Sequence, residues 1–133
     1  MRRARARRMR AKCLEELLVY QKAVAACDEV SSYLKRRSFE DNRRLRDQLG
    51  ASSERVGSLI SEGFGQGTDR HFASYLFTAR GSSKETRNQL RVAKTRGHIS
   101  ESERVTTSER YNEIERMLTS FAHYLRRSNR RRS

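Results

Sequence analysis

Arginine residues gather at both ends of this sequence in a pattern that suits contact with phosphate groups. Arginine outnumbers lysine by 25 to 5 in the chain. A planar guanidinium can hold a phosphate through two parallel hydrogen bonds, and it can also stack on an unpaired base. The basic residues of the two ends are Arg2, Arg3, Arg5, Arg7, Arg8, Arg10 and Lys12, and then Arg126, Arg127, Arg130, Arg131 and Arg132.

The net charge of +14 comes almost entirely from these two ends. They hold 12 basic residues and no acid, whereas the segment between them holds 18 basic and 16 acidic residues. Blocks of like charge stay solvated and commonly bind polyanions. We therefore expect the ends to bind nucleic acid, and RNA in particular because arginine suits unpaired bases. They lack the interleaved aromatic and leucine residues with which a helix enters a membrane surface, so no membrane partner is expected.

Another interpretation of the charge is a structural oligomeric scaffold whose basic ends serve only as solubilising tails. If the ends do not bind nucleic acid, the basic residues of the central segment are the next candidates. These are Arg43, Arg44, Arg80, Arg87 and Arg91.

Two Arg–His pairs raise an enzymatic alternative. Arg91 and His98, and likewise Arg116 and His123, are separated by six residues. This spacing occurs in metal-independent endoribonucleases of the HEPN class, which are also helical bundles. A chain with so many arginines produces about two such pairs by chance, and here an apolar residue follows each arginine where that motif has a polar one. We therefore expect a non-enzymatic protein and keep the nuclease as the alternative.

The sequence contains no pattern that would hold a cofactor, a small-molecule substrate or a metal ion. The glycine-rich segment 63–67 has neither the spacing nor the lysine of a phosphate-binding loop. The three histidines are far apart in sequence, and no HExxH or CxxC motif is present. Cys13 and Cys27 would lie about 21 Å apart along a helix, too far for a disulfide, so both are expected to be reduced.

Composition predicts a single all-α domain. The chain has 133 residues and no proline, 35% of its residues are hydrophobic, and its mean hydropathy is −0.96. A proline-free chain rich in arginine, leucine, alanine and glutamate suits long helices and has few of the turn signals that a many-stranded sheet requires. Its longest apolar runs fall far short of the roughly 20 residues that span a bilayer. We expect a cytoplasmic protein.

Apolar periodicity and helix-capping signals divide the chain into four helices. The first runs from about Lys12 to Arg37, and the second follows residues 38–41 and runs to about Glu62. The third begins after its N-cap Thr68 and ends at Gly97, and the fourth runs from a capping box of Ser100 and Glu103 to about Leu125. Short connections predict an up-down-up-down antiparallel four-helix bundle over 12–125, with flexible basic tails, 1–11 and 126–133, that meet at one end.

The first helix carries two apolar stripes, more than one face of a bundle needs. We expect the stripe Cys13, Leu17, Tyr20, Val24, Cys27, Ser31 and Leu34 to face the core. The second stripe then requires another subunit to cover it, which predicts a homo-oligomer. Its members are Val19, Ala23, Ala26, Val30 and Tyr33.

The remaining helices have single apolar stripes, which we expect to face the core. Those stripes are Leu45, Leu49, Ser52, Val56, Leu59 and Ile60; Phe72, Tyr75, Leu76, Ala79, Ser83, Thr86, Leu90 and Ala93; and Val105, Tyr111, Ile114, Leu118, Phe121 and Leu125. Among the tyrosines, only Tyr33 and Tyr124 are left as candidates to stack on bases.

Short motifs spread over most of the chain carry a family resemblance. They are Val19-Tyr20-Gln21-Lys22-Ala23, Asp47-Gln48-Leu49, Ile60-Ser61-Glu62-Gly63-Phe64-Gly65, Phe72, Tyr75-Leu76, Ala79-Arg80-Gly81-Ser82-Ser83, Glu85, Gln89-Leu90, Ala93 and Gly97-His98-Ile99-Ser100. From Leu14 to about Leu125 the chain resembles the four-helix-bundle proteins encoded by intervening sequences in bacterial large-subunit ribosomal RNA genes. The chain has Gly57 and Leu59 where that family usually has Pro and Asn.

The resemblance implies a homo-oligomer, typically a pentameric ring, without a known catalytic residue. The same fold occurs in the accessory variability determinant of diversity-generating retroelements, a basic pentamer that associates with a reverse transcriptase and its template RNA. A reverse transcriptase is therefore a candidate partner of this chain.

Overall fold

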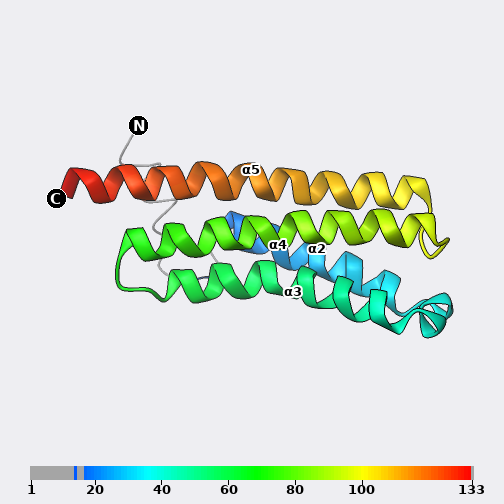
Figure 1. Ribbon diagram of the computed structural model, residues 1–133. Helices are drawn as coiled ribbons and strands as arrows, with labels where there is room; N and C mark the ends of the chain where they lie inside the picture. Colours follow the sequence, from blue (N-terminus) through cyan, green and yellow to red (C-terminus); the bar gives the residue numbers. More distant parts are fainter. Residues whose placement is uncertain (1–13, 15–16, 133) are drawn as a thin grey trace.

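The computed structural model describes Leu14 and residues 17–132, with side chains described as far as Ser128. Four α-helices follow one another in this described part, and a short 3₁₀ helix, η2, links the first two (Figure 1). Their bounds are α2 Leu18–Leu34, η2 Arg37–Asp41, α3 Arg43–Phe64, α4 Asp69–Thr95 and α5 Glu101–Arg132. The predicted all-α fold is confirmed.

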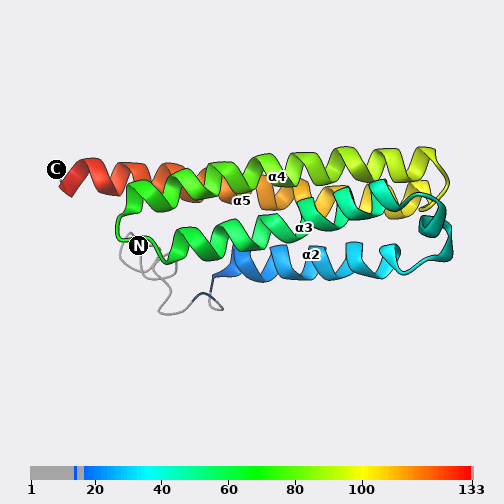
Figure 2. The ribbon, with the colours of Figure 1, turned by 60° about the horizontal axis from the view of Figure 1, so that its bottom comes forward.

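Contacts between neighbouring helices show that each pair is antiparallel, because residues further along one helix meet residues earlier in the next. The pairs are Lys22–Glu113 and Arg36–Glu103 between α2 and α5, Cys27–Ser53 and Leu34–Gly50 between α2 and α3, Ser52–Thr86 and Gly63–Phe72 between α3 and α4, and Arg80–Thr119 and Lys94–Glu101 between α4 and α5. The helices therefore form an up-down-up-down bundle in which α2 and α4 each lie between α3 and α5 (Figures 1 and 2).

The stripe of α2 that we expected at an oligomer interface lies in the core, whereas only Leu17 is fully buried among the described residues of the other stripe. Val30 in the second stripe is completely buried, and the hydroxyl of Tyr33 lies 2.8 Å from that of Thr107 in the core. The other stripe is partly exposed, with 40% of Val24 accessible. Alanines at two positions of the buried stripe let α2 approach its neighbours closely, and the bulkier stripe would not fit there. The stripe Val19, Ala23, Ala26, Val30 and Tyr33 is thus part of the core of one chain and not an oligomer interface.

Most of the other residues expected in the core are buried, but Val105 is 44% exposed. The buried face of α5 follows a regular spacing of four and three residues that begins at Thr107 and continues through Tyr111 and Ile114. Val105 stands two residues before this series, so it lies on another face of the helix. Thr107, which is completely buried, occupies the first core position instead.

Helix ends follow the capping signals in the sequence. The Thr68 hydroxyl accepts a hydrogen bond from a backbone N–H in the first turn of α4, at 3.2 Å. The Ser100 hydroxyl accepts from the Glu103 N–H, and the Glu103 carboxylate accepts from the Ser100 N–H, at 3.0 and 2.9 Å. Arg36 also donates to Glu103, and this bond is the largest cause that lowers the pKa of Glu103 to about 2. Gly97, with φ of +82°, follows α4 in the left-handed conformation that favours glycine.

The basic C-terminal segment, predicted as a tail beyond the helix, is helical where it is described, because α5 continues to Arg132. No glycine or proline interrupts the chain after residue 97, and arginine is a good helix former that also suits the negative end of the helix dipole. The end of α5 therefore projects past the α3–α4 connection (Figures 1 and 2). The N-terminal tail, residues 1–11, lies outside the described residues. None of the described helices is both long enough and apolar enough to cross a membrane.

Gly63, in the last turn of α3, allows α3 and α4 to approach closely. A Cβ atom at this position would lie 2.7 Å from the Tyr75 Cβ and 2.8 Å from the Phe72 Cδ1. Gly81 offers a contrast, because a Cβ added there in the middle of α4 would have no atom within 4 Å.

We expect Gly63→Ala to lower the free energy of unfolding by about 1–3 kcal/mol, because the methyl group overpacks the contact. The matched change Gly81→Ala should raise it by about 1 kcal/mol, since alanine is the better helix former. Urea unfolding followed by circular dichroism measures both. A stabilising Gly63→Ala change would show that α3 and α4 are further apart than described.

Candidate nucleic-acid interface

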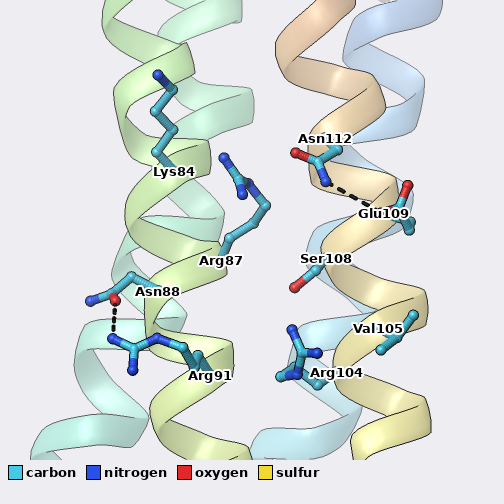
Figure 3. Close-up of a pocket in the computed structure, with 9 residues that line it drawn as sticks. All are labelled: Lys84, Arg87, Asn88, Arg91, Arg104, Val105, Ser108, Glu109 and Asn112. Carbon is cyan, nitrogen blue, oxygen red and sulfur yellow. Dashed lines mark hydrogen bonds between the residues drawn. The ribbon is translucent and has the colours of Figure 1, made fainter.

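A groove of about 370 Å³ runs between the outer faces of α4 and α5. On α4, its lining residues recur at the three- and four-residue spacing that places side chains on one face of a helix. The residues are Lys84, Arg87, Asn88 and Arg91 from α4, with Arg104, Val105, Ser108, Glu109 and Asn112 from α5 (Figure 3). Four of the nine are cations and one is an acid, so the groove is basic.

The contact between α4 and α5, called the seam below, contains an ion pair between Arg87, which lines the groove, and the buried Glu115. The Arg87 Nε and Nη2 atoms each donate to the Glu115 carboxylate at 2.7 Å, and the Ser83 hydroxyl donates to it at 2.8 Å. Glu115 is only 7% exposed, and its bonds to Arg87 are the main cause that raises the pKa of this guanidinium. A buried carboxylate with three such bonds holds α4 and α5 together and fixes Arg87 in place. The charge of Arg87 is thereby used within the protein.

Three other cations on the same face of α4 have no carboxylate partner among the described residues. Arg80 donates to the Thr119 hydroxyl at 3.1 Å, and Arg91 donates to the Asn88 side-chain oxygen at 2.8 Å. Lys84 lies between them and has no hydrogen bond or ion pair in the described part of the chain. These groups keep their charge available for a ligand, unlike Arg104, which is paired with Glu101.

Of the twelve basic residues predicted at the ends, Arg126 and Arg127 have described side chains, and both are exposed. Arg130, Arg131 and Arg132 continue the helix of α5, while residues 2–12 lie outside the described residues. Arg126 lies beside Arg80 in a second hollow of the α4–α5 seam, lined by Ser74, Phe77, Thr78, Arg80 and Arg126. The structure therefore places Arg126, one of the C-terminal cations, on the same seam as the groove.

The two histidines of the nuclease alternative have packing roles. His98 is 8% exposed and stacks on Phe39, with ring centroids 4.3 Å apart. Its Nδ1 lies 2.9 Å from the Ser38 hydroxyl and its Nε2 lies 3.2 Å from the Asn42 side-chain nitrogen. His123 packs edge-on against an aromatic ring of α4. In the described part of the chain, no three His, Cys, Asp or Glu side chains come close enough to hold a metal ion.

Phe77, the aromatic residue that lies in the seam, was not identified from the sequence. Tyr33 is buried and hydrogen-bonded, so it cannot stack on a base, and Tyr124 is half-buried. Phe77, which was not considered, is half-buried next to two arginines. A signal was present, because Phe77 lies off the core stripe of α4 and an arginine follows it one helical turn later. The groove residues Lys84, Asn88, Arg104, Ser108 and Asn112 were missed as well.

Comparison with known proteins agrees with the resemblance of the motifs. The family described as 23S rRNA-intervening sequence protein matches residues 15–120. A crystal structure of a protein of unknown function from the S23 ribosomal protein family of Bacteroides thetaiotaomicron shares the fold, with a TM-score of 0.71 and 18% identity over 79% of this chain and 98% of that chain. No curated protein matches the chain. Since the family match spans most of the sequence, this chain belongs to the 23S rRNA-intervening sequence protein family.

Proposed function

We propose that this protein is a non-enzymatic, oligomeric accessory factor that binds nucleic acid, and RNA in particular, along the α4–α5 seam and through its basic ends. The observation that carries the proposal is the row of Arg80, Lys84 and Arg91, which lies on one face of α4 and has no carboxylate partner in the described part of the chain. Cations held on a rigid face can release counterions from a polyanion without first being ordered. Membership of a family named after an rRNA insertion is consistent with this partner.

Continuity of the seam with the end of α5 extends the binding surface. Arg126 reaches the hollow beside Arg80, and α5 carries four further arginines beyond it. A strand of nucleic acid that follows the seam would therefore meet cations over its whole length. Contacts of this kind are made to phosphates, so the protein alone should bind tightly at low salt and discriminate weakly between sequences.

We further propose that the subunits assemble through the exposed face of α2 and α3. Val24 is 40% exposed there and Tyr20 is half-buried, opposite Gly57 and Ser58 of α3. These residues line a hollow of about 510 Å³. An apolar stripe beside small residues suits close contact with another helix. The family resemblance implies a ring of about five copies, and this face takes the place of the stripe that is buried in the core.

Two biological settings fit such a factor. In one, the protein serves the ribosomal RNA insertion that gives the family its name. In the other, it assists a reverse transcriptase and its template RNA in a diversity-generating retroelement. A reverse-transcriptase gene next to this gene would support the second setting, and a ribosomal RNA gene around it would support the first.

Removing two groove cations tests RNA binding. We expect Lys84→Ala combined with Arg91→Ala to weaken binding of a structured RNA and to lower the slope of log K against log salt by about two, because two phosphate contacts are lost. The matched control is Lys35→Ala with Arg37→Ala, which removes the same charge from exposed positions between α2 and α3. Fluorescence anisotropy over a salt series measures both pairs.

Equal losses in the two pairs would mean that net charge matters and the groove does not. A chain without residues 1–11 and 126–133, which removes 11 positive charges, then separates the groove from the ends. If the groove binds RNA, the Lys84 and Arg91 changes should still lower the affinity of this shortened protein.

We also expect structured RNA to stay intact when it is incubated with the protein in the absence of metal ions. Gel electrophoresis of end-labelled RNA checks this. Cleavage that disappears in either the His98→Gln or the His123→Gln protein would instead support the nuclease alternative.

Assembly is tested by a charge placed on the exposed face of α2. Val24→Glu should convert the oligomer into smaller species while the helical circular dichroism signal is kept. Val105→Glu is the matched control, because Val105 is similarly exposed (44% against 40%) but lies on α5 in the groove. Sedimentation velocity measures the mass, with 15.6 kDa expected for a monomer. A wild-type protein that sediments at this mass at micromolar concentration would exclude self-assembly.

A further inference from the structure

Phe77 holds an unusual position for a phenylalanine in this bundle. It is only partly buried, and it lies outside the regular core spacing of α4. The guanidinium groups of Arg80 and Arg126 lie over its ring, with their central carbons 4.9 and 4.7 Å from the ring centroid. The His123 ring contacts it edge-on, with centroids 5.7 Å apart. Phe77, Arg80 and Arg126, with Ser74 and Thr78, line a hollow of about 470 Å³.

We propose that this cluster of Phe77, Arg80, Arg126 and His123 is a stacking site for an unpaired base of a single-stranded nucleic acid. The inference rests on the proposed function and adds to it the form of nucleic acid that the seam selects. Aromatic rings bind bases by stacking wherever a base is unpaired, and neighbouring arginines supply contacts to the backbone.

Replacement of a guanidinium by a base on the face of the Phe77 ring should be favourable. A contact between an exposed arginine and an aromatic ring is weak, whereas stacking of a base on such a ring is stronger. An incoming base can therefore displace one guanidinium from the face of Phe77. Neither Arg80 nor Arg126 has a carboxylate partner among the described residues, so the displaced guanidinium stays close and can donate to the phosphate of the same nucleotide.

The site should prefer unpaired bases because the Phe77 ring can contact only the face of a base. Phe77 has no hydrogen-bonding group in its side chain, so it can recognise only the face of a base. In a duplex both faces of a base are covered by its stacked neighbours, and only the edges are accessible. Every base has an accessible face when it is unpaired, so the preference concerns strandedness and not sequence.

A change of Phe77 separates stacking from charge. We expect Phe77→Leu to weaken binding of a fluorescein-labelled 12-nucleotide single-stranded RNA by about tenfold. Binding of a fully paired RNA of the same length should be unchanged. The slope of log K against log salt should also stay the same, since no charge is removed. Phe64→Leu, the same change at a half-buried phenylalanine in the last turn of α3, is the matched control and should have no effect.

A second variant gives a direct signal and does not depend on the tolerance of leucine. The chain contains no tryptophan, so Phe77→Trp introduces a single tryptophan at the proposed site, and its fluorescence can be excited separately from that of the tyrosines. Its emission should be quenched on titration with the single-stranded RNA and not with the duplex. Affinity for the single strand should be equal to or higher than that of the wild-type protein.

The possible failures can be told apart. If the wild-type protein binds neither RNA, the proposed function itself is wrong. If Phe77→Leu binds the single strand as the wild type does while the Lys84 and Arg91 changes still weaken binding, only the stacking site is wrong. A Phe77→Leu protein with an altered sedimentation mass and unaltered RNA affinity would assign the cluster to contacts between subunits.

Discussion

Glu115 brings a carboxylate into the seam between α4 and α5, where it is acceptable only if it is paired and hydrogen-bonded. Arg87 and Ser83 provide those bonds from two successive turns of α4. Three directed bonds to one carboxylate permit a single rotation and a single register of the two helices. Everything placed along the seam depends on that register, including the row of cations on α4 and the position of Arg126 beside Phe77.

Hydroxyl groups continue this polar packing through the centre of the bundle. Thr86 donates to the Ser52 hydroxyl at 2.9 Å, and both side chains are completely buried. Small residues at such contacts allow the helix axes to approach closely, and their hydrogen bonds satisfy groups that would otherwise be costly to bury. The bundle thus combines an apolar core with a few specific polar contacts, and it is these contacts that align α3, α4 and α5.

Local signals in the sequence were sufficient to predict the four helices and their caps. Thr68, and the pair Ser100 and Glu103, act within one turn, so no tertiary information was needed to recognise them. The choice between the two stripes of α2 was wrong because both have the same periodicity. Which of them is buried depends on how closely α3 and α5 approach. The end of α5 was misplaced because a run of arginine was interpreted as a solvated tail, although nothing in it stops a helix.

Less of the candidate site could be predicted. The basic ends were identified from composition alone, whereas the groove depends on which faces of α4 and α5 meet. That information lies in the pairing of Arg87 with Glu115, which are 28 residues apart. Sequence spacing correctly placed Arg80, Arg87 and Arg91 on α4, but it did not show that the charge of Arg87 is neutralised while the other two remain available. Phe77 has one local signal, Arg80 one turn later, but its contact with Arg126 joins two helices and could not be predicted from spacing.

The continuation of α5 past the bundle makes Arg126 part of a helix. Each residue turns the helix by about 100° and advances it by about 1.5 Å, so the direction of Arg126 is set by the number of residues that separate it from the core. A flexible tail tolerates insertions and deletions, because its charges are averaged over many directions. Here, insertion of one alanine just after Leu125 would turn Arg126 by about 100° away from Phe77, with no change in net charge. The position of Arg126 around the helix axis, as well as its charge, therefore determines whether it reaches Phe77.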